Sequence, residues 1–200
     1  MTRPQAGECF CLLGPNGAGK TTTIRMLTGV LGVSAGDAWV WGESLLGPGG
    51  MDRTRALMGV CPQFDVLWDS LTALEHLELF AAIKGLPGAQ DAIRSESMAL
   101  LRDVRLDDVA GKRAGQYSGG MRRRLSVAVA LLGDPLFVTM DEPTTGMVRL
   151  GVPLPSLDAC PDAVDILESL TSGCLCVRAC PLAARSPTLG PRAVLVQGVE

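Results

Sequence analysis

Aromatic side chains, histidine and long apolar runs are all scarce in this chain of 200 residues. Only 4% of the residues are aromatic, and His76 is the single histidine. No stretch approaches the ~18–20 uncharged apolar residues that span a bilayer, so we predict no transmembrane helix. The few residues before Cys9 leave no room for a signal peptide, and we expect none. A membrane role would act through a partner or through sequence beyond these residues.

Positive charge is limited too. The formal net charge of −3 gives no electrostatic support for nucleic-acid binding, and the one compact basic run is Arg122 to Arg124. The seven cysteines show no zinc-site spacing, and we expect them to be reduced thiols. His76 lacks a nearby ligand cluster, which favours a packing or surface role over metal binding or catalysis. A length of 200 residues suits one domain.

Residues 14–22, Gly-Pro-Asn-Gly-Ala-Gly-Lys-Thr-Thr, lie between an apolar run at 9–13 and a helix-like stretch that starts near Lys20. This arrangement matches the spacing G-x-x-x-x-G-K-T of a phosphate-binding loop. Its glycines allow positive φ and turn backbone N–H groups into a concave anion site at a helix N-terminus. Lys20 can reach the outer phosphates and the Thr21 hydroxyl can coordinate Mg²⁺. The alternative is a glycine turn that binds nothing. The spacing of the motif, the Lys20-Thr21 pair and the flanking strand and helix together favour a nucleoside triphosphate site.

Helices and strands alternate along the rest of the chain as far as residue 147. We predict short strands at 38–41, 57–61 and 136–140, and helices at 72–84, 89–104 and 118–132. The first of these helices opens with a capping box, Thr72 to Glu75. Its predicted apolar face comprises Leu74, Leu77, Phe80, Ala81 and Ile83. The strand at 136–140 ends in Asp141 and Glu142, and open α/β sheets bind ligands off such strand ends.

Three further motifs accompany the phosphate loop: Cys61-Pro62-Gln63-Phe64-Asp65, Tyr117-Ser118-Gly119-Gly120-Met121 and Thr139-Met140-Asp141-Glu142-Pro143-Thr144-Thr145-Gly146. In this order they resemble the Q-loop, signature motif and Walker B region of the nucleotide-binding domain of ABC transporters. The residues in these motifs are most similar to those of the A subfamily, which moves lipids and sterols. The resemblance implies an α/β P-loop NTPase fold with a mainly parallel sheet, a small antiparallel β part and a helical subdomain at about 64–132. It covers about residues 7–147, so we expect a partial ATP-binding domain at 1–147 that is incomplete at both ends.

The resemblance also implies the cofactors and their ligands. ATP and Mg²⁺ would be bound, and the residues implied to contact ATP are Gly14, Asn16, Gly17, Ala18, Gly19, Lys20, Thr21, Thr22, Gln63, Ser118, Gly119 and Gly120. Thr21, Gln63 and Asp141 would place or sense the metal, and Glu142 would be the catalytic residue that polarises the attacking water. Ser118 would face ATP held by a second nucleotide-binding domain. The other implied partners are transmembrane domains at the cytoplasmic face of a membrane.

The resemblance stops near Met147. The family continues with Asp-Pro and a later histidine, whereas here Val148 follows and no histidine occurs after His76. The divergent tail, 148–200, predicts at most weak strands at 173–177 and 193–196 that would cover an open sheet edge. We therefore expect a truncated domain that binds ATP rather than turning it over. The alternatives are a non-catalytic fragment that works by protein contact and a soluble ABC ATPase of translation or DNA maintenance.

Overall fold

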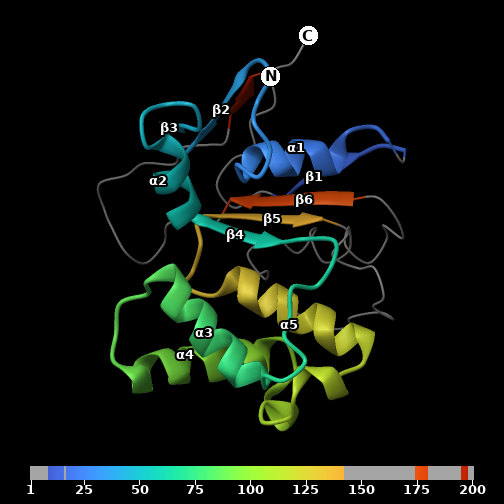
Figure 1. Cartoon of the computed structure of the whole chain (residues 1–200), viewed down its shortest axis with the longest axis vertical. Coiled ribbons are helices and arrows are strands. Elements are labelled where there is room, and N and C mark those ends of the chain that lie inside the picture. Colours follow the sequence, from blue (N-terminus) through green and yellow to red (C-terminus); the bar gives the residue numbers. More distant parts are fainter. Residues whose placement is uncertain (1–8, 16, 142–173, 180–194, 198–200) are drawn as a thin grey trace. The chain divides into compact units, whose positions relative to one another are not determined.

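The computed structural model describes residues 9–15, 17–141, 174–179 and 195–197, and these fall into two compact units (Figure 1). The first unit draws on 9–60, 135–141 and the two tail segments, and the second spans 61–134. The first contains strands β1 (Cys9–Leu13), β2 (Asp37–Val40), β3 (Glu43–Ser44), β4 (Met58–Cys61, at the boundary), β5 (Phe137–Asp141), β6 (Cys174–Ala179) and β7 (Leu195–Gln197), with helices α1 (Lys20–Leu27) and α2 (Gly50–Ala56). The second contains helices α3 (Ala73–Lys84), α4 (Gln90–Asp103) and α5 (Gly119–Leu131).

The main sheet of the first unit has the strand order β1-β6-β5-β4. β6 is antiparallel to both β1 and β5, which therefore run in the same direction on either side of it. β4 points the same way as β5 (Figure 1). Strands β1, β4 and β5 thus run parallel to one another, as predicted for the main sheet, and the tail strand β6 runs against them. Strand formation was predicted for 173–177, and the structure confirms it with β6. The expectation that this strand covers an open sheet edge was wrong, because β6 lies inside the sheet between β1 and β5.

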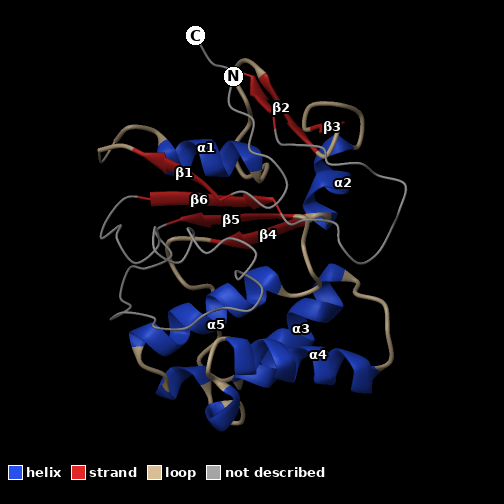
Figure 2. Cartoon of the chain, turned by 180° about the vertical axis from the view of Figure 1, so that it is seen from behind, coloured by secondary structure: helices blue, strands red, loops and turns tan. Residues whose placement is uncertain are grey.

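Helix α1 packs on this sheet and closes the core of the first unit (Figure 2). Ile24 and Leu27, three residues apart on one helix face, are each 5% exposed and cluster with the fully buried Phe137 of β5. Val40 of β2 and Met58 of β4 belong to the same cluster. The apolar spacing of α1 therefore fixes the helix, and with it the loop before the helix, against β5.

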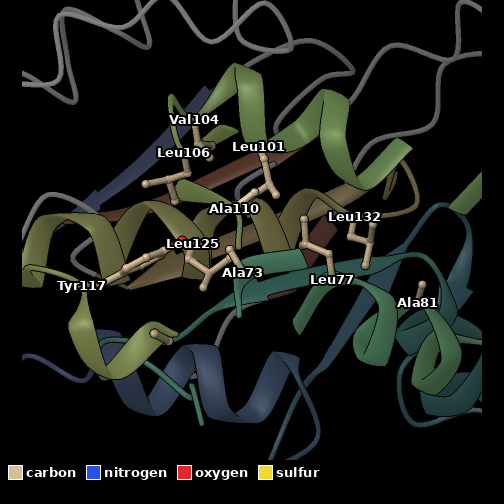
Figure 3. Packing of buried hydrophobic residues seen from close by; sticks show 12 residues of the cluster. Ala73, Leu77, Ala81, Leu101, Val104, Leu106, Ala110, Tyr117, Leu125 and Leu132 are labelled. Carbon is tan, nitrogen blue, oxygen red and sulfur yellow. The ribbon is translucent and has the colours of Figure 1, made fainter. Parts of the chain in front are cut away.

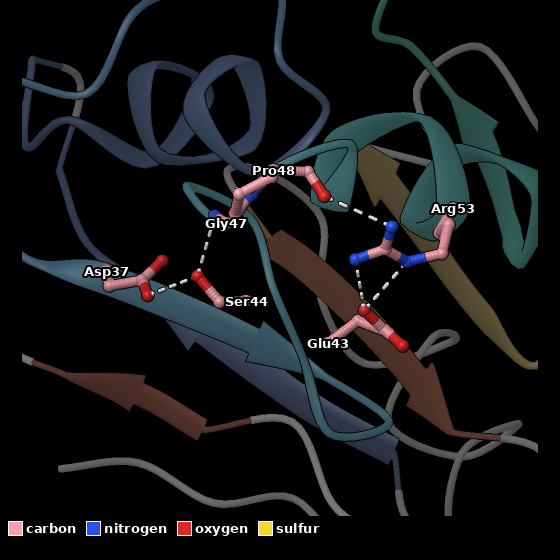
Figure 4. A network of polar contacts seen from close by, with 6 residues as sticks. All are labelled: Asp37, Glu43, Ser44, Gly47, Pro48 and Arg53. Atoms are coloured by element: carbon pink, nitrogen blue, oxygen red, sulfur yellow. Dashed lines mark hydrogen bonds and ion pairs between the residues drawn. The ribbon is translucent and has the colours of Figure 1, made fainter.

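A smaller antiparallel sheet, β3-β2-β7, completes the first unit. Figure 4 shows polar contacts within this sheet and between the sheet and α2. Ser44 Oγ donates to Asp37 Oδ2 at 2.6 Å, and Arg53 of α2 donates through Nε to Glu43 Oε2 at 2.9 Å. Arg53 Nη1 also donates to Pro48 O at 3.1 Å. The second weak tail strand, predicted at 193–196, is confirmed as β7.

The second unit is a helical core around α3, α4 and α5 (Figure 3). Thr72 and Glu75 form the predicted capping box, since Glu75 N donates to Thr72 Oγ1 and Thr72 N donates to Glu75 Oε2. Leu77 and Ala81 of the predicted apolar face are fully buried. Ile83 was wrongly placed on that face: it is 65% exposed, because six residues beyond Leu77 turn it about 240° around the helix axis.

Candidate functional site

The glycine loop between β1 and α1 has the geometry that a phosphate group requires. Gly17 and Gly19 adopt φ of 87° and 90°, the left-handed region that suits glycine, and a Cβ built at either position meets no atom within 4 Å. The space beside the loop is therefore open. Lys20 is only 8% exposed, and its Nζ donates to Gly14 O at 2.6 Å and to Pro15 O at 3.0 Å. A cation is thus held within the loop by carbonyl oxygens, which phosphate oxygens can replace.

Helix α1 begins at the loop with an N-terminus suited to an anion. Its N-cap is Gly19, which supplies no side-chain cap, and no acidic residue lies in the first turn of this described helix. The first-turn N–H groups and the positive dipole end are therefore directed at whatever occupies the loop. Thr21 is half-buried and Thr22 exposed in the same turn. These residues fit a triphosphate with its Mg²⁺, since hydroxyl oxygen is a suitable ligand for that ion.

Asp141 ends β5 at the same edge of the sheet as the loop. In the strand register, Leu12 of β1 pairs with Leu175, and Leu175 pairs with Asp141. Two strand spacings separate the Leu12 and Asp141 backbones, about 10 Å. Strand alternation places Asp141 on the face of Phe137, which packs against α1, and Asp141 is 4% exposed. Asp141 and the loop that carries Lys20 therefore lie at the same end of the sheet.

The remaining predicted site residues divide between the second unit and undescribed positions. Asn16 and Glu142 lie outside the described residues. Gln63 is half-buried in the segment after β4. Ser118 is the N-cap of α5, and its Oγ accepts a hydrogen bond from Met121 N at 3.3 Å, as the motif predicted. Gly119 has open space where a Cβ would lie.

The three arginines after the signature motif contact three different segments of the second unit. Arg122 Nη1 donates to Asp69 Oδ1 at 2.5 Å. Arg123 Nη1 donates to Pro62 O at 2.5 Å, and Arg124 Nη1 donates to Arg105 O at 3.0 Å. All three arginines therefore form hydrogen bonds within the second unit. The sequence gives no local signal for these pairings, because each partner lies far away along the chain.

His76 is a packing residue of α3. It is fully buried, its Nε2 accepts a hydrogen bond from Trp68 N at 2.9 Å, and its Nδ1 lies 2.7 Å from Thr72 O. These partners together require the neutral ring, with the proton on Nδ1. Burial lowers the pKa of His76, the Arg122 charge lowers it further, and the hydrogen bond to Thr72 opposes the shift. The histidine thus fixes the segment between Gln63 and α3 to the first turns of α3, through its hydrogen bond with Trp68.

Because the pKa of His76 is lower in the fold than its ordinary value of 6.5, the unfolded chain takes up the proton first as pH falls. The associated stability is fully present above about pH 6.5 and declines as pH falls from there towards the folded-state pKa. We expect His76→Gln, which cannot titrate, to lack this part of the pH dependence. The free energy of unfolding in urea, measured from pH 7.5 to 5.5, tests this expectation. An equal dependence of this free energy on pH in the two proteins would contradict the lowered pKa of His76.

Comparison with known proteins agrees with these features. Residues 3–145 match the family model described as ABC transporter. The chain is 60% identical over 140 residues to ABC transporter A family member 11 of Arabidopsis thaliana, covering 70% of this chain and 14% of that protein. It is 48% identical over 141 residues to ATP-binding cassette sub-family A member 2 of Rattus norvegicus, covering 70% of this chain and 6% of that protein.

Solved structures give the same result for the fold. A structure of the ATP-binding subunit of an ABC transporter is similar with a TM-score of 0.60 at 28% identity, covering 78% of this chain and 60% of that one. A dimeric ATP-binding cassette in a post-hydrolysis state, bound to ADP and Pi, is similar with a TM-score of 0.59 at 25% identity, covering 68% and 61%.

The sheet, the glycine loop and these structural neighbours define a P-loop NTPase domain of the ATP-binding cassette type. The chain belongs to the ABC transporter family and corresponds to a nucleotide-binding domain of its A family. It spans only a small part of the relatives' length, 14% of the plant protein and 6% of the rat protein. Among the described residues, no helix has the length and apolar character to cross a membrane.

Proposed function

We propose that this chain binds Mg·ATP at the edge of the sheet where β1 and β5 end. The observation that carries the proposal is the joint position of Lys20 and Asp141: a buried cation within an open glycine loop, and a buried carboxylate at the end of β5, the parallel strand two positions from β1 in the sheet. Phosphoryl-transfer proteins rely on such placement of opposite charges around the phosphates and their metal.

Each residue has a distinct part in this proposal. The N–H groups of 14–20 and the Lys20 ammonium hold the phosphates, and Thr21 Oγ1 and Asp141 provide oxygen ligands for the metal. When bound, Mg²⁺ neutralises charge on the phosphate oxygens. Gln63 senses the γ-phosphate or the metal, and Glu142 orients a water. Ser118, Gly119 and Gly120 present the N-terminus of α5 to ATP held by a second nucleotide-binding domain.

We further propose that binding, without sustained turnover, is the activity of this chain. Val148 stands where the family continues with Asp-Pro after Met147, and no histidine follows His76 to close over the γ-phosphate. Positioning supplies most of the catalysis in phosphoryl transfer, so missing positioning groups affect turnover more than affinity.

The proposed physiological setting is the cytoplasmic face of a membrane, with transmembrane domains of an A-type transporter that moves lipids. An exposed apolar segment directly after Gln63 supports a protein partner. Phe64 is 78% exposed, Val66 60% and Trp68 45%. Large apolar side chains gathered on one exposed segment are typical of an interaction surface.

Isothermal titration calorimetry of the full chain with ATP tests the binding proposal. We expect saturable heat for ATP in the presence of Mg²⁺ and weaker binding when EDTA removes the metal, since Thr21 and Asp141 then lose the ion they share with the phosphates. Phosphate release by the same protein should stay at the buffer rate. Folded protein that produces no heat with Mg·ATP would overturn the binding proposal. Sustained Mg²⁺-dependent turnover would overturn the proposal that the chain binds ATP without hydrolysing it.

A further inference from the structure

Arg123 is buried near the start of α5 and forms hydrogen bonds with the segment that carries Gln63. The residue is 2% exposed. Its Nη1 lies 2.5 Å from Pro62 O, 3.4 Å from Gln63 O and 3.3 Å from Asp65 Oδ1. One guanidinium nitrogen therefore contacts two backbone carbonyls and a carboxylate within a few residues of chain. Charge-assisted contacts of this kind are stronger than neutral ones and fix direction as well as distance.

Asp65 is held by a second residue of the same helix. Ser126 Oγ donates to Asp65 Oδ1 at 2.8 Å, and Ser126 is 5% exposed. Arg123 and Ser126 lie three residues apart, so they project from the same face of α5. We refer to these three residues, Arg123, Asp65 and Ser126, as the clamp. The clamp fixes the chain on both sides of Gln63, through Pro62 O before it and Asp65 after it.

The neighbouring arginines contact other segments of the second unit. Arg122 Nη1 donates to Asp69 Oδ1 and to Ala114 O, and Arg124 Nη1 donates to Val104 O and Arg105 O. Consecutive helical residues point about 100° apart, so each arginine meets a different segment. Arg124 is therefore a matched control, with the same side chain on the same helix at a distant segment.

We propose that Arg123 is a positioning residue that sets the backbone at Gln63 relative to α5, whose N-terminus Ser118 caps. The clamp makes the Gln63 segment and the signature helix move as one body, so a change at either one is transmitted to the other. This inference rests on the proposed function, because that function assigns Gln63 and Ser118 to ATP.

Hydrogen–deuterium exchange on the full chain tests the clamp without nucleotide. In Arg123→Met, which keeps an apolar stem but no donors, we expect amides at 63–66 to exchange at least about tenfold faster than in the parent chain. Arg123→Lys should restore part of the protection, since an ammonium can reach the same oxygens. Arg124→Met should speed exchange near 104–106 and leave 63–66 unchanged. Equal exchange at 63–66 in the parent chain and Arg123→Met would overturn the clamp.

The same measurement with Mg·ATP tests the positioning role. In the parent chain, Mg·ATP should slow exchange both at the loop, 17–22, and at 63–66; in Arg123→Met the effect at 63–66 should be lost while the loop remains protected. Protection at the loop but not at 63–66 in the parent chain would refute the positioning role and leave the binding proposal intact. Protection at neither would refute the binding proposal. Should Arg123→Met fail to fold, Asp65→Asn and Ser126→Ala carry the same expectations with smaller changes.

Discussion

Replacing Lys20 with methionine is expected to weaken Mg·ATP binding by about 30-fold or more while the fold persists. Removing one member of a buried, hydrogen-bonded charge pair typically costs about 2–5 kcal/mol of binding free energy. The side chain is 8% exposed, and its ammonium is placed in the loop by Gly14 O and Pro15 O. Methionine keeps the apolar stem and removes the charge. Calorimetric titration with Mg·ATP gives the change in Kd, and thermal unfolding verifies the fold.

Lys84→Met is the matched control for this experiment. Lys84 also donates to backbone carbonyls, Leu132 O at 2.8 Å and Val129 O at 3.4 Å, but these lie at the C-terminal end of α5. Burial of the Lys84 ammonium lowers its pKa, as expected for a lysine that contributes to the fold. We expect Lys84→Met to lower the thermal midpoint and to leave Mg·ATP affinity within about twofold, because the two sites share no partners. Equal losses of affinity in both variants would contradict a specific role for Lys20.

Proline at position 176 is expected to destabilise the first unit by about 3 kcal/mol or more, because it removes an N–H and fixes φ inside a sheet. Cys176 is the residue of β6 that pairs with Cys11 of β1 and with Met140 of β5. Its N–H points to only one of these neighbours, so the change removes a ladder hydrogen bond on one side, while the fixed φ distorts the strand that both β1 and β5 pair with. Urea unfolding gives the loss of stability, and hydrogen exchange at 9–13 and 137–141 should lose its protection.

Cys176→Val is the control for the proline variant, since valine keeps the N–H and favours extended backbone. It should unfold at nearly the same urea concentration as the parent chain. If Cys176→Pro behaved like Cys176→Val, β6 would not be a necessary strand of the sheet, and the tail would be dispensable for the loop and its strand.

Local chemistry accounts for the parts of the fold that the sequence predicted. The capping box of α3, the Ser118 cap of α5 and the glycine loop each depend on residues close together in the chain. Strand β5 was predicted from a continuous apolar run, and all of its residues are buried. The shared edge of Lys20 and Asp141 followed from the rule that ligands bind off the carboxyl ends of parallel strands.

Other features depend on contacts across the chain and were not predicted. No helix was predicted for α2, whose Gly50 lies against Ser44 O so closely that a Cβ would clash. The strand propensity of β6 is local, but its antiparallel position between β1 and β5 depends on partners more than thirty residues away. The clamp is likewise nonlocal, since Arg123 and Asp65 are separated by 58 positions.

The position of β6 has a consequence for the order in which the chain folds. Helices α3, α4 and α5 lie within 61–134 and can assemble as soon as that stretch has left the ribosome. Strand β1 is synthesised before this stretch, yet its partner strand β6 comes after it and ends at Ala179. The glycine loop therefore gains this supporting strand only after the helical unit has been synthesised. Such long-range pairing folds slowly, so during translation the helical unit forms ahead of the unit that contains the glycine loop.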